Sequence, residues 1–290
     1  MSKFISGFGV TIVLRDRFMI KRSIKNILLH LRLGRVFDTC LFWYSRVVNY
    51  IPNLIFRRKN PSFVLPPDYF LHETFQLKYD LYKRDGEHSA AELIEWATKY
   101  KPDIVNILDW GCGVARITRH LSGNFNSNVN VTGIDINAQM VEWNKSNIPG
   151  VEFREIQYCP PTGLPNSYYD LVIGVSVFTH IECSHHESWL EEISRILQEG
   201  GLFIFTTHGE HFYNKLNTQE FKKLLKHGCF TQAYEQAGHR MMSTYMVADE
   251  FRKKLAPCFD VLEFHAGHLD LSKTGGQDLW ILRKRLRHEI

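Results

Sequence analysis

Short apolar runs alternate with stretches of helical spacing from about residue 89 to the end of the chain. The runs have the length of buried β-strands, and glycine or acidic residues flank several of them. Helical patterns at Ser89–Tyr100, Ala138–Ser146 and Trp189–Leu197 separate most of the runs. This alternation predicts an α/β fold with a mostly parallel sheet and helices on both faces. The predicted strands are Val105–Asp109, Val129–Asp135, Val151–Ile156, Tyr169–Val175, Leu202–Thr207, Val261–His265 and Leu279–Leu282.

The N-terminal part of the chain follows a different pattern. From Ile20 to Phe56, apolar residues recur at helical spacing with Lys and Arg between them. Residues 1–60 contain 12 Lys and Arg but only two acids, whereas the other 230 residues carry 23 basic and 29 acidic side chains. Prolines at 61, 66 and 67 interrupt the helical pattern. We therefore predict a basic amphipathic helical segment over residues 1–60 and a second domain over residues 61–290.

Three roles fit this basic segment. It can cover the second domain as a helical cap, lie on an anionic membrane surface, or dock another protein. A nucleic-acid partner is not expected, because no continuous basic groove with aromatic platforms is predicted in the second domain. No apolar stretch is long enough for a transmembrane helix, and we expect a cytoplasmic protein that can associate peripherally with a membrane.

The overall composition is that of a globular protein, with 290 residues of which 44% are hydrophobic and 23% charged. The six cysteines are widely spaced and include no CxxC pair, which favours a reducing compartment. Several histidines lie near one another in the sequence, but none has the spacing of a complete zinc site, so no metal is expected.

The most informative motif is Asp109-Trp-Gly111-Cys-Gly113, where an apolar run enters a glycine turn that opens a helix. Glycines let a ligand approach the backbone closely, and a helix N-terminus presents unpaired N–H groups. A dinucleotide-binding loop needs a third small residue where this chain has Arg116, and Asp109 would repel a pyrophosphate. These departures argue against the alternative of a nicotinamide-dependent oxidoreductase and favour a cofactor with a cationic amino group.

A second acid, Asp135, ends the next predicted strand 22 residues after Gly113, at the separation typical of ribose binding. With Asp109, Gly111 and Gly113, it resembles the class I S-adenosylmethionine-dependent methyltransferase family. The resemblance covers residues 103–207. It continues through the apolar runs at 153–157 and 169–173 and through Glu199-Gly-Gly-Leu202.

The resemblance implies a Rossmann-like seven-stranded sheet with an antiparallel last strand, and S-adenosylmethionine as the cofactor. Gln157 stands where the family usually has Asp, but an amide oxygen can still accept from the adenine amino group. The segment 208–250 is expected to be an insertion that caps the acceptor site. The cofactor residues implied are Asp109 for the ammonium group, Gly111 and Gly113 for the methionine part, Asp135 for the ribose, and Ile136 with Gln157 for the adenine.

Methyl transfer to a hydroxyl also needs a base, and two histidines follow predicted strands on the side where the crevice should lie. His180 is the first candidate and His208 the second, although either can instead bond the backbone or shape the pocket. Gly275–Leu279 can reach the acceptor or form a simple turn, and we expect a small-molecule or glycan acceptor. A noncatalytic binding module that docks a partner through the basic helices is the alternative.

Overall fold

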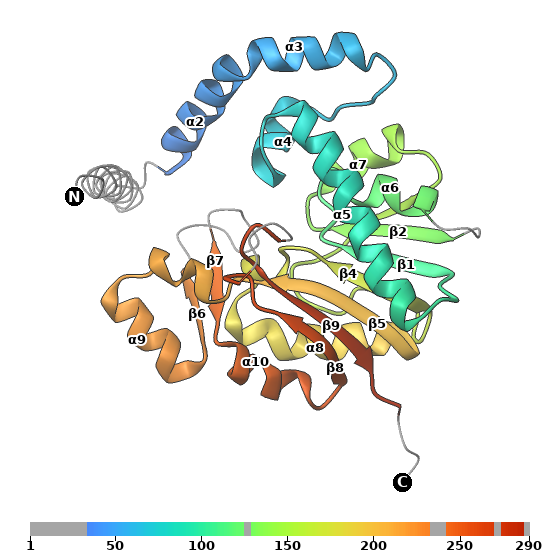
Figure 1. Cartoon of the computed structure of the whole chain (residues 1–290), viewed down its shortest axis with the longest axis vertical. Coiled ribbons are helices and arrows are strands. Elements are labelled where there is room, and N and C mark those ends of the chain that lie inside the picture. Colours follow the sequence, from blue (N-terminus) through green and yellow to red (C-terminus); the bar gives the residue numbers. More distant parts are fainter. Residues whose placement is uncertain (1–33, 125–128, 233–241, 270–273, 287–290) are drawn as a thin grey trace, which may run out of the picture. The chain divides into compact units, whose positions relative to one another are not determined.

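This computed structural model describes residues 34–124, 129–232, 242–269 and 274–286. The chain divides after Pro61 into two compact units. The helices, all drawn in Figure 1, are α2 (Gly34–Val48), α3 (Tyr50–Lys59), α4 (Asp68–Thr74), α5 (Tyr79–Tyr100), α6 (Thr118–Leu121), α7 (Ala138–Asn147), α8 (His186–Ile196), α9 (Thr218–His227) and α10 (Ala248–Leu255).

Seven strands form one sheet in the order β3-β2-β1-β4-β5-β9-β8. The pairs among β1 to β5 are parallel, whereas β9 is antiparallel to both β5 and β8. This confirms the expected sheet and its antiparallel last strand. The strands are β1 (Asn106–Trp110), β2 (Asn130–Asp135), β3 (Glu152–Glu155), β4 (Tyr169–Gly174), β5 (Leu197–Thr207), β8 (Phe259–His265) and β9 (Asp278–Lys284).

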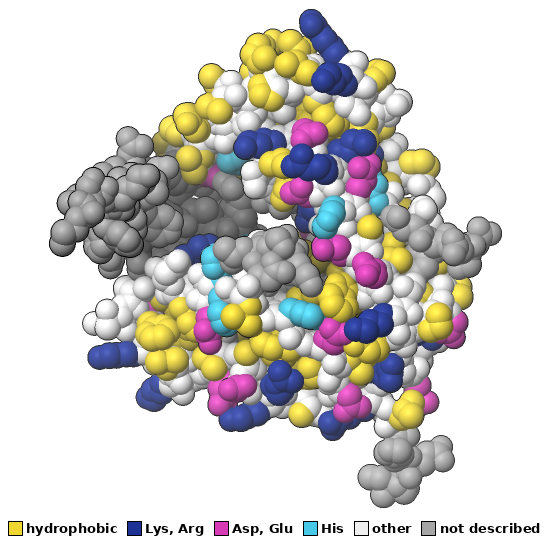
Figure 2. All heavy atoms as spheres, in the orientation of Figure 1, with side chains coloured by type: hydrophobic (Ala, Val, Ile, Leu, Met, Phe, Trp, Pro, Cys, Tyr) yellow, Lys and Arg dark blue, Asp and Glu magenta, His cyan; other side chains and the backbone are white. Residues whose placement is uncertain are grey.

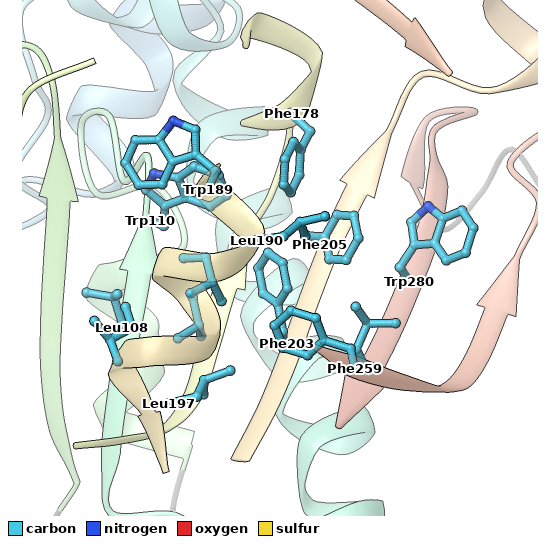
Figure 3. Packing of buried hydrophobic residues seen from close by; sticks show 14 of the residues in the cluster. Leu108, Trp110, Phe178, Trp189, Leu190, Leu197, Phe203, Phe205, Phe259 and Trp280 are labelled. Carbon is cyan, nitrogen blue, oxygen red and sulfur yellow. The ribbon is translucent and has the colours of Figure 1, made fainter. Parts of the chain in front are cut away.

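Alternate residues of each central strand point to opposite faces of the sheet, because side chains alternate along a strand. In β5, Phe203 and Phe205 pack into one hydrophobic cluster, and Leu202 and Ile204 pack into the other. The first cluster includes Trp110, Trp189 and Trp280, and Figure 3 shows its side chains between the sheet and α8. Helix α5 covers the opposite face (Figure 1). The sheet is therefore covered on both sides, as predicted.

The helices α2 and α3 lie in the first unit, within the segment that is expected to be helical. The expectation for residues 20–33 lies outside the described residues. Within the described residues, no helix is long and apolar enough to span a membrane.

The segment after β5 contains elements that the apolar pattern did not show. A 3₁₀ helix (Glu210–Lys215) and α9 are followed by a separate two-stranded antiparallel sheet of β6 (Cys229–Gln232) and β7 (Ser243–Met246). We name this pair of strands the insertion hairpin.

The structure contains a disulfide that the cysteine spacing did not indicate. Cys183 and Cys229 form a disulfide across 46 residues of sequence, while the other four cysteines are free. Cys183 lies in a 3₁₀ helix (Cys183–His185) and Cys229 begins β6, two elements that the fold places in contact. Wide sequence spacing therefore concealed a close pair of thiols.

Candidate functional site

The glycine turn after β1 is bound to the end of β2 by its backbone. The N–H groups of Gly111 and Cys112 both donate to the carbonyl of Ile134, at 2.8 and 3.0 Å. Gly111 has φ +73°, and a Cβ there would lie 2.5 Å from Cγ2 of Val177. Gly113 has φ +51°. Both positions therefore require glycine, and the turn leaves its backbone close to the cavity described below.

Asp135, at the end of β2, stabilises the same turn. Its Oδ2 accepts from the N–H of Gly113 at 2.8 Å, and its Oδ1 accepts from the N–H of Asn137 at 2.9 Å. Burial raises the pKa of this carboxyl, and the two backbone N–H groups oppose that rise. A carboxylate has about four acceptor positions. Asp135 can thus hold the turn and still accept hydrogen bonds from ribose hydroxyls.

Asp109 is buried at the start of the turn, with 4% of its surface exposed. Its Oδ2 accepts from Oγ1 of Thr118 at 2.5 Å. Burial raises the pKa of Asp109 to about 7, against the lowering effects of Thr118 and the Arg116 charge. A carboxyl in such a place is stabilised in its charged form by a bound cation, which fits the ammonium group of an amino-acid moiety.

A cavity of about 1020 Å³ lies over this turn, at the ends of β1, β2 and β4. That is the edge of a parallel sheet where ligands bind in open α/β folds. Of the six predicted cofactor residues, five line it, namely Asp109, Gly111, Gly113, Asp135 and Ile136. Gln157 is exposed and is not among the lining residues, whereas its neighbours Ile156 and Tyr158 are. The role of Gln157 stays a prediction.

His180 lines the same cavity. It ends a 3₁₀ helix (Phe178–His180) that follows β4, and its Nδ1 lies 2.8 Å from the carbonyl oxygen of Met242, just before β7. A carbonyl can only accept, so in the neutral ring Nδ1 carries the hydrogen and Nε2 carries the lone pair. This tautomer is the one that a base acting through Nε2 requires.

His208, the second predicted base, is placed differently. It is 8% exposed, is not among the cavity-lining residues, and packs against the rings of Phe212 and Tyr245. Burial, with smaller effects from Lys215 and His180, lowers the pKa of His208 to about 3. The structure thus brings His180, but not His208, to the cavity that contains the predicted cofactor residues.

Three further polar residues of the cavity form a group that no sequence spacing suggested. Ser176 follows β4 with φ +64°, an uncommon conformation for a residue other than glycine. Its N–H donates to Oγ1 of Thr206 at 2.8 Å, and Nε2 of Gln277 donates to its hydroxyl at 2.8 Å. Gln277 is 101 residues away in sequence. Its place in the cavity is consistent with the prediction that Gly275–Leu279 reaches the acceptor.

Arg116 also lines the cavity, beside Asp109. Its guanidinium lies over the ring of Phe75, 4.6 Å from the ring centre. Within the described residues, no group of three or more His, Cys, Asp or Glu is arranged to hold a metal ion.

Comparisons with known proteins agree with this geometry. Residues 107–201 match the model of a methyltransferase domain family. A malonyl-[acyl-carrier protein] O-methyltransferase from Paenibacillus sp. (strain JDR-2) is 22% identical over 171 residues. The match covers 57% of this chain and 57% of that protein, so this chain spans little more than half the length of the curated relative.

Solved structures show the same fold. A SAM-dependent methyltransferase from Methanosarcina mazei superposes with a TM-score of 0.53 at 19% identity, over 67% of this chain and 98% of that one. The 1,6-didemethyltoxoflavin-N1-methyltransferase of Burkholderia thailandensis, determined with bound 1,6-didemethyltoxoflavin and S-adenosylhomocysteine, gives a TM-score of 0.50 at 16% identity, over 71% of this chain and 85% of that one. The sequence match over residues 107–201 is thus to a methyltransferase domain, and the solved structures show that the chain shares the fold of such proteins. They give no support to the oxidoreductase alternative.

Proposed function

We propose that this protein is an S-adenosylmethionine-dependent methyltransferase that acts on a hydroxyl group of a small-molecule or glycan acceptor. The observation that carries the proposal is a single cavity lined by Asp109, Gly111, Gly113 and Asp135 and also by His180. One space therefore joins the residues suited to the cofactor with a residue suited to accept a proton. The noncatalytic alternative assigns no role to a histidine in that space.

The residues present fit the cofactor. Asp109 is a buried carboxylate suited to an ammonium group, Asp135 has spare acceptor positions for ribose hydroxyls, and a Cβ at Gly111 would clash with Val177. When bound, S-adenosylmethionine supplies a methyl group activated by the positive charge on its sulfur.

The chain's own contribution is orientation and proton removal. Trp189 and Ile181 give the cavity apolar walls that help to exclude water. Nε2 of His180 would accept the proton of the acceptor hydroxyl, while Nδ1 keeps its hydrogen bond to the Met242 carbonyl. The name of the Paenibacillus relative, an O-methyltransferase, supports an oxygen acceptor.

Two variants test the proposal. Asp135→Ala should abolish measurable binding of S-adenosylhomocysteine in calorimetry. His180→Gln should leave that affinity within about twofold and slow methyl transfer to hydroxyl acceptors by roughly 10²- to 10⁴-fold. Asp103→Ala, whose side chain is 78% exposed, serves as the control. Normal affinity in Asp135→Ala would refute the ribose assignment, and unchanged turnover in His180→Gln would remove the base.

We further propose that α2 and α3 bind an anionic membrane surface facing the cytoplasm. Large hydrophobic side chains are exposed along both helices, among them Trp43, Val47 and Ile51. The run Arg57-Arg58-Lys59 ends α3. Figure 2 shows hydrophobic side chains gathered over these helices, with basic ones beside them. Apolar side chains next to basic ones match the interface of a bilayer that contains anionic lipid.

Co-sedimentation with phosphatidylcholine vesicles, with and without phosphatidylserine, tests this surface. We expect binding that requires the anionic lipid and falls by roughly a hundredfold when Arg57, Arg58 and Lys59 become Gln, at about 1 kcal/mol per charge. The control changes three exposed lysines of α9, Lys222, Lys223 and Lys226, to Gln. Equal loss in both variants, or no binding to either vesicle, would contradict the proposal and favour a protein partner.

A further inference from the structure

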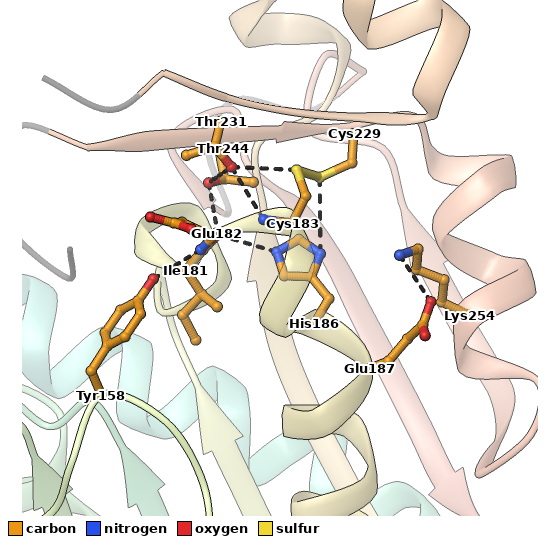
Figure 4. The surroundings of a disulfide bond; sticks show 10 residues. All are labelled: Tyr158, Ile181, Glu182, Cys183, His186, Glu187, Cys229, Thr231, Thr244 and Lys254. Carbon is orange, nitrogen blue, oxygen red and sulfur yellow. Dashed lines mark hydrogen bonds and ion pairs between the residues drawn. A yellow bond between two sulfur atoms is a disulfide. The ribbon is translucent and has the colours of Figure 1, made fainter.

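The insertion hairpin is joined to the loop that carries His180 at several points. The carbonyl of Met242 accepts from Nδ1 of His180, and Oγ1 of Thr244 donates to the carbonyl of Ile181 at 2.7 Å. Oγ1 of Thr231 accepts from the N–H of Cys183 at 3.2 Å. The Cys183–Cys229 disulfide adds a covalent bond to this junction, as Figure 4 shows. His180 and Ile181 line the cavity, so the junction lies directly behind the proposed acceptor site.

Each sulfur of the disulfide has a polar neighbour that suits a free thiol. Sγ of Cys183 lies 3.3 Å from Oγ1 of Thr231. Sγ of Cys229 lies 4.0 Å from Nδ1 of His186, whose Nε2 is 3.2 Å from the Ile181 carbonyl. Because that carbonyl takes the Nε2 hydrogen, Nδ1 of His186 has its lone pair toward the sulfur. Both thiols of a reduced protein would thus find acceptors without rearrangement of their neighbours.

A small reductant can also approach the disulfide. Cys229 lines a second cavity, of about 430 Å³, between α8 and α10. Cys229 and Cys183 are each partly exposed.

We propose that the Cys183–Cys229 disulfide is a redox-sensitive positioning element for His180. In the oxidised protein it holds the insertion hairpin against the 180–183 loop, so that the Met242 carbonyl fixes the Nδ1–H tautomer. A dithiol reductant breaks the Sγ–Sγ bond, both cysteines become thiols, and the reductant becomes a disulfide. The hairpin then stays attached by its hydrogen bonds and by the packing of Tyr245 and Met246, and His180 loses its fixed tautomer for part of the time. The catalytic meaning of this switch rests on the proposed role of His180.

Nuclear magnetic resonance on the full chain, labelled with ¹⁵N at the histidine rings, tests the proposal without an acceptor. His180→Gln assigns the His180 signals. In the oxidised protein we expect a single Nδ1–H tautomer with a slowly exchanging hydrogen. After reduction with dithiothreitol, we expect a mixture of the two tautomers. We also expect the Nδ1 hydrogen to exchange roughly tenfold faster, because its hydrogen bond to the Met242 carbonyl is weakened. Cys183→Ser with Cys229→Ser should reproduce the reduced state, whereas Cys258→Ser, at a free cysteine, should not.

Thiol titration of the unfolded, unreduced chain must first give four thiols. Six thiols would overturn the proposal, and so would an unchanged His180 tautomer after reduction to six. If the double variant does not fold, the reductant experiment on the natural chain decides alone. Calorimetry with S-adenosylhomocysteine, measured in both redox states, is expected to show equal affinity. If S-adenosylhomocysteine binds in neither state, the proposed function is refuted. The tautomer measurement would still decide whether the disulfide positions His180.

Discussion

The carboxyl of Asp109 affects both the stability of the fold and the proposed binding of the cofactor. Its carboxyl is buried beside the glycine turn, where burial raises the pKa to about 7. Because this folded-state pKa lies above the unfolded value, the ionisation of Asp109 lowers the stability of the unliganded protein as the pH rises from about 4 to 7. The same ionisation creates the negative charge that an ammonium group needs. The cost in stability therefore falls in the pH range in which the cofactor site becomes effective.

We predict that affinity for S-adenosylhomocysteine increases roughly tenfold between pH 6 and pH 8, as Asp109 ionises. Calorimetry at both pH values measures this change. In Asp109→Asn the affinity should be low and nearly independent of pH, and thermal stability should decline less from pH 4 to 7 than in the natural protein. Asp103→Ala should behave like the natural protein. An equally steep pH dependence in Asp109→Asn would show that another group controls binding.

Short motifs predicted the cofactor residues better than the acceptor residues. Asp109, Gly111 and Gly113 lie within five positions, and Asp135 follows at a spacing set by one strand–helix–strand unit. Ser176 and Gln277, in contrast, meet across 101 residues. Their contact depends on how β9 inserts between β5 and β8, which local periodicity does not determine.

At the scale of elements, the sequence predicted all seven strands of the main sheet, and the clearest patterns belong to strands that are buried on both faces. The strands β1, β4 and β5 are nearly continuous apolar runs because helices cover both sides. The insertion hairpin was missed because each of its strands has four residues, and β6 is only partly buried. The early half of α5 was missed for a related reason, since charged pairs such as Lys83–Glu87 mask its apolar spacing.

Helix α8 is attached to the loop before β4 by one carboxylate. Glu192 accepts from the N–H of Thr162 at 2.8 Å and from Nε of Arg195 at 2.8 Å, and Arg195 also donates to the Leu164 carbonyl. Burial alone would raise the pKa of Glu192, but these hydrogen bonds and the Arg195 charge lower it to about 2. The carboxylate therefore stabilises the fold above about pH 4.5, and this contribution is lost as the pH falls toward 2.

We predict that Glu192→Gln lowers the free energy of unfolding by about 3 kcal/mol at pH 7 and by much less at pH 3. Urea unfolding at the two pH values measures the difference. Glu191→Gln, at the adjacent exposed position, is the matched control and should change neither value appreciably. A loss that is the same at both pH values would mean that packing of the side chain, rather than its charge, stabilises this junction.

At the scale of the whole molecule, the two units carry different chemistry. Every residue that lines the main cavity lies between Glu73 and Leu279, within the unit that begins at Ser62. The basic residues that give the first 60 positions their positive charge lie outside this second unit. The proposed cofactor site and the proposed membrane surface are thus separate in sequence, although one chain connects them.

We predict that a chain beginning at Ser62 binds S-adenosylhomocysteine with an affinity within about twofold of the full chain. The two hydrophobic clusters of the sheet and the glycine turn lie entirely within residues 62–290, so removal of the first unit leaves their packing intact. Calorimetry on both chains, with circular dichroism to verify the fold, provides the test. A loss of tenfold or more in a folded protein would show that the first unit completes the cofactor site. Retained affinity would show that the first unit is not needed for cofactor binding and would leave its basic helices available for the proposed membrane surface.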